Sequence, residues 1–140
     1  MAMKKVTGIG GVFFKSKDPK KISDWYGDKL GLVINPYGSV FEFRQGAAPD
    51  KKGYAVWSPF KEDTDYFSPS KESFMVNYRV ADLKALLEDL RSKGVEVAGE
   101  IEEYEYGKFA HIVDPEGRKI ELWEPIDEVF TKEYEGKSTM

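Results

Sequence analysis

The sequence contains no cysteine, and this absence excludes disulfide bonds, cysteine nucleophiles and zinc sites built from thiolates. Histidine is nearly absent as well, because His111 is the single histidine of the chain. Chemistry that needs several imidazole groups is therefore excluded. Any imidazole-based catalysis depends on His111 alone.

Long apolar runs and dense basic stripes are also missing. No run approaches the roughly 20 apolar residues that a membrane-spanning helix needs, and the first 11 residues lack a signal-peptide pattern. The chain carries 21 basic and 25 acidic residues, a formal net charge of −4, which gives no field to attract phosphate backbones. We therefore expect a cytoplasmic protein that binds neither nucleic acid nor membranes.

The residues that are present indicate one globular domain. A chain of 140 residues matches the common size of single domains, about 100–150 residues. Its composition is 41% hydrophobic and 33% charged, which leaves no tract polar enough to stay unfolded. We expect residues 1–140 to form a single domain that is ordered almost throughout.

Two segments of the chain share one plan, a strand followed by a helix that begins at an aspartate. In residues 11–33, Asp18 can cap a helix and Pro19 occupies the first helical position, where proline is tolerated. Apolar residues then recur at three- and four-residue spacing and predict one buried face of this helix: Ile22, Trp25, Tyr26 and Leu30.

The second segment, residues 75–97, repeats this plan with a clearer pattern. Val76, Tyr78 and Val80 alternate as in a half-buried strand, and Asp82 occupies the capping position. The helical stripe that follows consists of leucines: Leu83, Leu86, Leu87 and Leu90. A glycine, Gly31 or Gly94, ends each helix.

Strands separated by turn-rich segments follow each helix, which completes a βαβββ module in each half. The first half adds strands at residues 39–44 and 54–57, and the second half adds strands at 108–113 and 118–124. The last two strands are joined by Asp114-Pro115-Glu116-Gly117, which predicts a tight turn. The modules span about 6–60 and 74–125, with a long connection at 59–73 and a partly helical or loose tail at 126–140.

With this repeat, and with the Asp-Pro-Glu-Gly turn before Lys119-Ile-Glu-Leu-Trp123, the chain resembles the superfamily of glyoxalases, bleomycin-resistance proteins and extradiol dioxygenases. Members of this superfamily are called vicinal oxygen chelate proteins. The resemblance covers roughly residues 6–125. It implies an α+β fold in which two βαβββ modules form a curved mixed sheet around a central cavity, with the helices on the outer face. It also implies a homodimer.

The resemblance further implies four metal-ligand positions. Glu121 stands at the last-strand glutamate position, whereas Gly11 and Met75, each seven residues before a capping aspartate, stand at the two first-strand positions. The fourth position falls near Trp57 and Ser58. Because Glu121 alone offers a strong ligand and such sites need three or four, a divalent metal is disfavoured. Glu121 is the one candidate ligand for a weakly held ion, and the sequence names no cofactor.

Glu121 and His111 are the candidate catalytic residues. Alternation along the last strand places Glu121 and Trp123 on the cavity face, and His111 lies beside Glu121 across the predicted hairpin. A glutamate that contacts an imidazole can act as a general base with an orienting partner. The alternatives are a histidine that only fills space between Phe109 and Val113, and a glutamate that forms a salt bridge with Lys119 or Arg79.

The chain has more aromatic residues than the packing beneath two helices needs, so we expect several to line the cavity. They would form an apolar pocket for flat or hydrophobic molecules, with Glu121, His111 and tyrosine hydroxyls fixing the orientation of the ligand. The candidate lining residues are Phe13, Trp57, Tyr104, Tyr106, Phe109 and Trp123.

Three hypotheses of function follow. The first is a binding protein that holds an aromatic or hydrophobic compound without metal, as bleomycin-resistance relatives do. The second is a lyase or isomerase in which Glu121, with or without a metal, transfers a proton on a small carbonyl or epoxide-like substrate. The third is an interaction module whose cavity is filled. The missing metal ligands and the abundant aromatic residues favour the binding protein.

Overall fold

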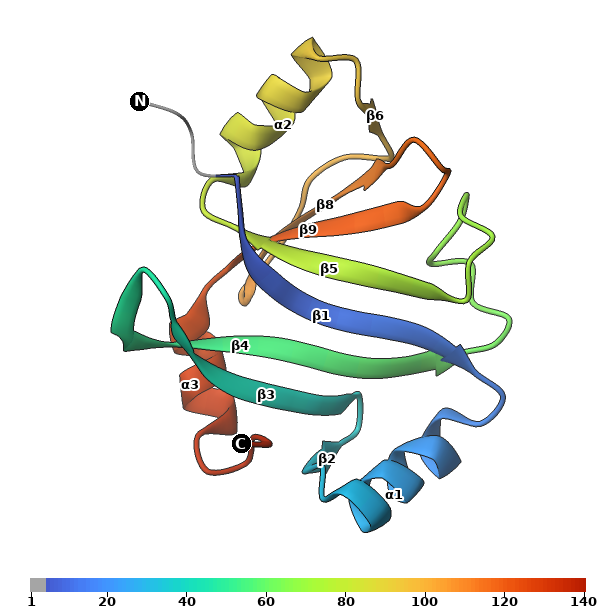
Figure 1. Cartoon of the computed structure of the whole chain (residues 1–140), viewed down its shortest axis with the longest axis vertical. Helices are drawn as coiled ribbons and strands as arrows, with labels where there is room; N and C mark the ends of the chain where they lie inside the picture. Colours follow the sequence, from blue (N-terminus) through green and yellow to red (C-terminus); the bar gives the residue numbers. More distant parts are fainter. Residues whose placement is uncertain (1–4) are drawn as a thin grey trace.

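Both halves of the chain contain the predicted order of a strand, a helix and further strands in the computed structural model, which describes residues 5–140 (Figure 1). The first half consists of β1 (Val6–Ser16), α1 (Pro19–Leu30), β2 (Ile34–Asn35), β3 (Gly38–Gln45) and β4 (Ala48–Lys61). The second half consists of β5 (Phe74–Val80), α2 (Leu83–Ser92), β6 (Glu96–Val97), β7 (Glu102–Tyr104), β8 (Gly107–Val113) and β9 (Lys119–Pro125). A third helix, α3 (Asp127–Tyr134), follows.

The two long helices begin and end where the sequence predicts. The Asp18 side chain accepts a hydrogen bond from the backbone N–H of Lys21 at 3.1 Å, and Asp82 accepts one from Ala85 at 3.1 Å. Each bond satisfies an amide group that the start of a helix otherwise leaves free, which stabilises a helix by about 1 kcal/mol. Gly31 ends α1 in the left-handed conformation, with φ of 78°.

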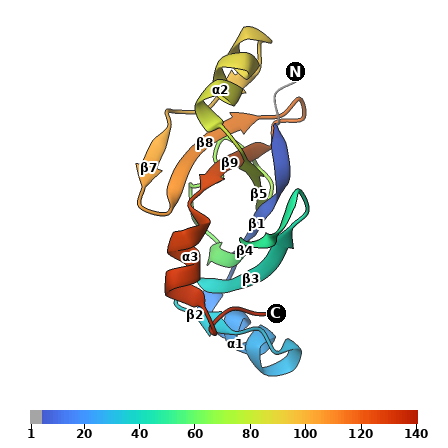
Figure 2. The same cartoon turned by 90° about the vertical axis from the view of Figure 1, so that its left-hand side faces the viewer.

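The strands form one curved, open sheet in the order β2-β3-β4-β1-β5-β9-β8-β6, and β7 pairs with β8. The pairs β1/β4 and β5/β9 are parallel and the other pairs are antiparallel. The two halves meet where β1 lies antiparallel to β5. This α+β architecture confirms the predicted fold class. In the view of Figure 2 the sheet curves, and α3 lies on the inner side of the curve.

The outer face of the sheet is covered unequally by α1 and α2. The leucine stripe of α2 is buried except for Leu90, which is partly buried, and it packs on Val80, Ala110 and Leu122 of the sheet. The apolar face predicted for α1 is only partly buried, because Trp25 and Leu30 remain 50% and 61% exposed. Tyr26 makes the main aromatic contact of α1 with the sheet, with its ring centre 4.7 Å from that of Trp57.

The tail is partly helical, which is one of the two predicted alternatives, and it packs on the sheet, so the alternative of a loose appendage is wrong. Phe130 of α3 is buried and packs in one cluster with Val40, Tyr54 and Trp123 on the inner face of the sheet. Beyond the helix, the backbone N–H of Thr139 donates to the carbonyl oxygen of Val40 at 2.8 Å. The predicted arrangement of helices on the outer face thus holds for α1 and α2, whereas α3 covers the inner face.

The connection between the halves is shorter than the sequence predicts, because β4 continues to Lys61. It is also well packed. Phe67 is fully buried and packs with Phe13 and Met75. Tyr66, beside it, lines the central cavity. Within residues 5–140, none of the helices is both long and apolar enough to cross a membrane.

Candidate functional site

A cavity of about 570 Å³ lies on the inner side of the sheet and is lined by residues from distant parts of the chain. The first half, the second half, the connection and α3 each contribute to its walls. Residues from these four parts include Phe13, Ser58, Asn77, Glu121, Tyr66 and Phe130. The cavity therefore depends on the tail as well as on the repeated halves.

Glu121 is a buried carboxylate in the wall of this cavity, with 2% of its surface exposed. Three side chains contact its oxygens. Asn77 Nδ2 donates to Oε1 at 2.6 Å, and His111 Nε2 lies 2.8 Å from Oε2. The hydroxyl of Tyr66 also donates to Oε2. Together these contacts fix the orientation of the carboxylate.

The strand register explains why these groups meet. Asn77 pairs with Glu121 between the parallel strands β5 and β9, and His111 pairs directly with Glu121 between the antiparallel strands β8 and β9. Directly opposed side chains in a sheet lie within contact distance. The contact between His111 and Glu121 that the hairpin predicts is thus present in the structure.

His111 does not itself line the cavity, in contrast to the expectation from the sequence. It is buried, and the ring of Tyr66 packs against it edge to face with centroids 5.4 Å apart. His111 therefore reaches a ligand only through Glu121. The salt bridges considered for Glu121 are absent among residues 5–140: Arg79 pairs with Asp127, and the amine of Lys119 donates to the Tyr66 carbonyl oxygen at 2.7 Å.

Tyr66 is a site residue that the sequence analysis missed, since its loop carried no motif. Burial raises the pKa of its phenol well above the usual value, and the nearby charge of Glu121 raises this pKa further. The hydroxyl therefore stays protonated at neutral pH. As a result, Tyr66 can act toward Glu121 only as a hydrogen-bond donor.

Asn77 is the second missed residue, although alternation along β5 places it on the cavity face. Its side chain is 1% exposed, and its Oδ1 has no hydrogen-bond partner among the described residues. The amide fits against the backbone of Gly10, where a Cβ atom would collide with Oδ1. A buried acceptor without a partner costs roughly 1–3 kcal/mol, so a water or ligand donor would stabilise it.

Aromatic rings form much of the cavity wall, and five of the six predicted rings contribute: Phe13, Tyr104, Tyr106, Phe109 and Trp123. Phe109 stacks on Trp123 with centroids 5.7 Å apart and planes 8° apart. Tyr104 stacks on Tyr106 in the same way at 5.4 Å. Because Tyr104 and Tyr106 are 45% and 38% exposed, their rings are accessible to a ligand.

The sixth ring, that of Trp57, does not line the cavity, so this prediction is wrong. Trp57 lies beside Phe14 and Tyr26, with centroids 5.3 and 4.7 Å away. Side chains alternate between the faces of a strand. Since its neighbours Val56 and Ser58 line the cavity, Trp57 must point to the side that carries α1.

A buried ion pair fixes the tail to the sheet next to the cavity. The guanidinium of Arg79 binds both carboxylate oxygens of Asp127, at 2.9 and 2.6 Å, and donates to the Tyr54 carbonyl at 3.0 Å. It also lies over the ring of Trp123 at 5.6 Å. Removing one partner of such a pair leaves an uncompensated buried charge, so the pair holds the start of α3 in place.

The four positions of the superfamily's metal site do not fit a divalent ion. Gly11 has no side chain, Met75 is packed among aromatic rings, and the hydroxyl of Ser58 donates to the Tyr37 carbonyl at 2.5 Å. Residues 5–140 contain no group of three or more His, Asp or Glu side chains suited to a metal. Glu121 is the one strong ligand among the four positions, and its oxygens are already bonded to three donors.

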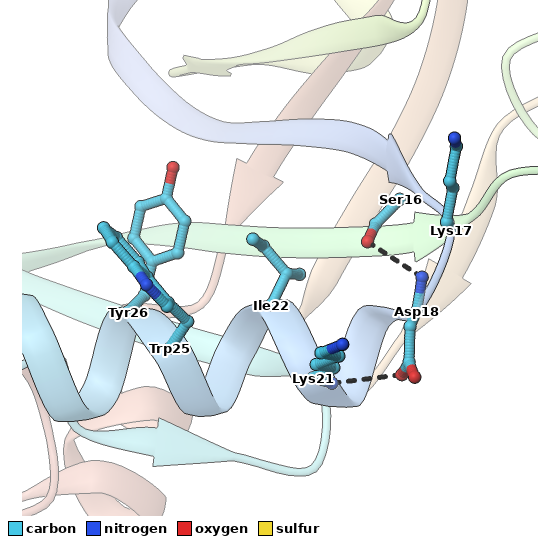
Figure 3. A pocket seen from close by; sticks show the side chains of 7 residues that line it. All are labelled: Ser16, Lys17, Asp18, Lys21, Ile22, Trp25 and Tyr26. Atoms are coloured by element: carbon cyan, nitrogen blue, oxygen red, sulfur yellow. Dashed lines mark hydrogen bonds between the residues drawn. The ribbon is translucent and has the colours of Figure 1, made fainter.

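A second, shallower depression of about 500 Å³ lies at the start of α1 (Figure 3). Ser16 and Asp18 form its two hydrogen bonds, and both hold the first turn of the helix. Trp25 and Tyr26 lie at its other end. Because its polar groups serve the helix start and none is buried, the central cavity is the stronger candidate site.

Comparisons with known proteins agree with this geometry. A family model described as a glyoxalase-like domain matches residues 11–123. A search of curated proteins finds no match to this sequence.

Several solved structures share the fold. Methylmalonyl-CoA epimerase from Mycobacterium tuberculosis is 23% identical, with a TM-score of 0.61 over 94% of this chain and 96% of the epimerase. The Streptomyces coelicolor epimerase, in complex with 2-nitronate-propionyl-CoA, is 16% identical, with a TM-score of 0.63 over 86% and 99%. A Legionella pneumophila structure described as an NAD-dependent benzaldehyde dehydrogenase is 13% identical, with a TM-score of 0.53 over 82% and 97%. At these low sequence identities the structural similarity establishes a shared fold alone.

Proposed function

This chain belongs to the glyoxalase-like domain family of the vicinal oxygen chelate superfamily, and from this premise we propose that it binds an aromatic or hydrophobic small molecule in the central cavity without a metal ion. The observation that carries the proposal is the cavity of about 570 Å³ with aromatic walls and the buried carboxylate of Glu121. Pockets for small molecules commonly have about 300–1,000 Å³ and a few fixed polar groups in an apolar lining.

The donor set around Glu121 supports binding that needs no metal. In metal-dependent relatives this glutamate position supplies a ligand atom, whereas here Asn77, His111 and Tyr66 already donate to the carboxylate. These three contacts hold the side chain in one orientation. A fixed acceptor of this kind selects and orients a ligand that carries a hydrogen-bond donor.

The test is a screen of aromatic metabolites and antibiotics by thermal shift, followed by calorimetry in the presence of a chelator. A ligand at 100 times its Kd stabilises the folded state by about 2.7 kcal/mol, which corresponds to roughly 5–10 °C for a chain of this size. Chelation is expected to leave the shift unchanged. A shift that appears only after Mn, Ni, Zn or Fe is added would contradict a metal-free site.

Two valine variants test whether the ligand binds in the central cavity. Val129→Trp fills the cavity from α3 and is expected to abolish binding, because Val129 lines the cavity. Val33→Trp adds the same bulk at a position that is 43% exposed and lies outside the cavity lining, and serves as the matched control. Equal affinities for the two variants would show that the ligand binds elsewhere.

A second candidate function is proton transfer by Glu121 on a small carbonyl compound. The direct contact between Glu121 and His111 favours it, because this pair resembles a base with an orienting partner. Glu121 would take the proton from the carbon beside the carbonyl group and return it to the same carbon. In heavy water, NMR would then show deuterium entering the substrate, and Glu121→Gln would stop the exchange while Glu103→Gln would not. No exchange across a panel of carbonyl compounds would leave binding as the function.

The homodimer and the cytoplasmic location expected from the sequence remain part of this proposal. Apolar side chains are exposed along β1, where Val6, Ile9 and Val12 are 51%, 50% and 42% exposed, and exposed apolar patches often mark interfaces. Sedimentation equilibrium is expected to give a dimer that Val12→Glu weakens and Val33→Glu does not. A monomer at high concentration would contradict the dimer.

A further inference from the structure

All the charged side chains that line the central cavity are acidic. They are Glu102, Glu105, Glu121 and Glu133, and no lysine or arginine lines the cavity among the residues that the structure describes. None of these four glutamates forms a salt bridge with a lysine or arginine within residues 5–140. The formal charges of the described lining residues are therefore all negative.

Basic side chains close to the lining residues have other partners. Arg79 binds Asp127 through two hydrogen bonds, outside the cavity lining. Lys119 donates to the Tyr66 carbonyl oxygen, and its partial burial lowers the pKa of its amine. The imidazole of His111 contacts the Glu121 carboxylate, with Nε2 2.8 Å from Oε2. Glu121 is buried, whereas Glu102, Glu105 and Glu133 are exposed, so their attraction for a cation is partly screened by solvent. The excess of negative charge still favours a cationic occupant over an anionic one.

Asn77 gives an independent indication of what the occupant carries. The Oδ1 atom of this almost fully buried side chain has no donor among the described residues. Buried acceptors of this kind are nearly always hydrogen-bonded in folded proteins. Since Oδ1 faces Gly10 in the cavity wall and almost none of it is accessible, an N–H group of a ligand supplies the missing bond only after a small shift of the Asn77 amide toward the cavity.

The aromatic walls complete the environment of a cation. The stacked rings of Tyr104 and Tyr106 flank Glu105 in the sequence, Glu102 lies two residues before Tyr104, and all four side chains line the cavity. Trp123 and Phe109 present further rings. A cation over an aromatic face gains about 0.5–2 kcal/mol, with the larger values where water is excluded.

We propose that the ligand of the central cavity is a protonated organic amine carried on an aromatic or hydrophobic frame. This inference rests on the proposed function and narrows it to one class of ligand. The amine would lie among the glutamates and, after a small shift of the Asn77 amide, donate to its Oδ1, while the frame packs on the aromatic walls. Anionic compounds, including coenzyme A esters, are disfavoured by the same charges.

Three probes of one shape and different charge test this inference. They are 2-naphthylmethylamine, which is cationic at neutral pH, the neutral 2-naphthalenemethanol, and the anionic 2-naphthoate, each titrated by calorimetry at low salt. We expect the amine to bind at least tenfold more tightly than the alcohol, and the carboxylate to bind more weakly than the alcohol. Added salt should weaken binding of the amine most, because it screens the partly exposed charges.

Charge-neutralising variants test which glutamates cause the preference for the amine. Glu105→Gln and Glu133→Gln are each expected to reduce the preference for the amine over the alcohol severalfold. Glu103→Gln removes the same charge from β7 at a side chain that does not line the cavity, and should leave the preference unchanged. Because these positions are not in the buried core, all three variants are expected to fold.

The outcomes separate this inference from the proposed function. If the amine and the alcohol bind equally, or the carboxylate binds most tightly, the inference is wrong while binding in the cavity stands. If none of the three probes binds, the inference is also wrong, and the broader screen of metabolites and antibiotics judges the proposed function by itself. A preference for the amine that Glu103→Gln also removes would likewise overturn the inference.

Discussion

Replacing Phe130 by alanine is expected to destabilise the protein strongly, because this ring anchors α3 over the cavity. Phe130 is 9% exposed and packs on Tyr54 and Trp123 with ring centroids 5.6 and 5.3 Å away. Truncation of a buried phenylalanine costs about 3–5 kcal/mol, the sum of lost burial and the hole left behind. For a domain of this size, a loss of about 3 kcal/mol lowers the melting temperature by roughly 6–12 °C.

Urea unfolding followed by tryptophan fluorescence measures this loss. Phe74→Ala is the matched control, since Phe74 is 39% exposed on β5 and does not line the cavity. Its truncation is expected to cost less than half as much. A free-energy change below about 1 kcal/mol for Phe130→Ala, or equal changes for the two variants, would refute the packing of the tail against the sheet. If the unfolding free energy depended less steeply on urea concentration while the midpoint concentration stayed the same, the variant would instead have changed the surface exposed on unfolding.

Three further predictions concern the groups around the cavity. Asp127→Ala leaves the buried guanidinium of Arg79 without its partner and is expected to destabilise the fold by about 3–5 kcal/mol in urea unfolding; a neutral effect would show that the ion pair is not formed. The raised pKa of Tyr66 means that the folded state resists ionisation of this phenol, so its contribution to stability is present below pH 10 and is lost as the pH rises above 10. Tyr66→Phe should therefore make unfolding less dependent on pH above 10, and an unchanged alkaline profile would contradict the burial of its hydroxyl. Trp57→Ala should lower the melting temperature while ligand affinity, measured by calorimetry, stays within twofold, because Trp57 contacts the α1 side of the sheet; a large loss of affinity would place its ring in the cavity after all.

Local patterns in the sequence predicted the parts of the structure that depend on near neighbours. The capping aspartates Asp18 and Asp82 mark the helix starts because each bonds an amide three residues away. The tight turn fixes the register of β8 and β9, and so the contact of His111 with Glu121 followed from counting residues across the hairpin. These features need no knowledge of the remaining fold.

Features that depend on distant segments were missed. Tyr66 reaches Glu121 across 55 positions of the chain, and nothing in its loop predicts this contact. For the tail, by contrast, a local pattern was available. Its apolar residues follow a helical spacing that indicates a packed helix: Ile126, Val129, Phe130 and Tyr134. For Trp57 the alternation was available, but the register of β4 was uncertain by one residue, and one residue changes the face.

A crystal structure of the protein with bound 2-naphthylmethylamine tests the central claim most directly. The account predicts the naphthyl ring against the aromatic walls near Trp123, with the amine within hydrogen-bond distance of Asn77 Oδ1 or of a lining carboxylate. A probe found in the depression beside Trp25, with the central cavity closed by side chains or with Glu121 turned away from it, would contradict the account.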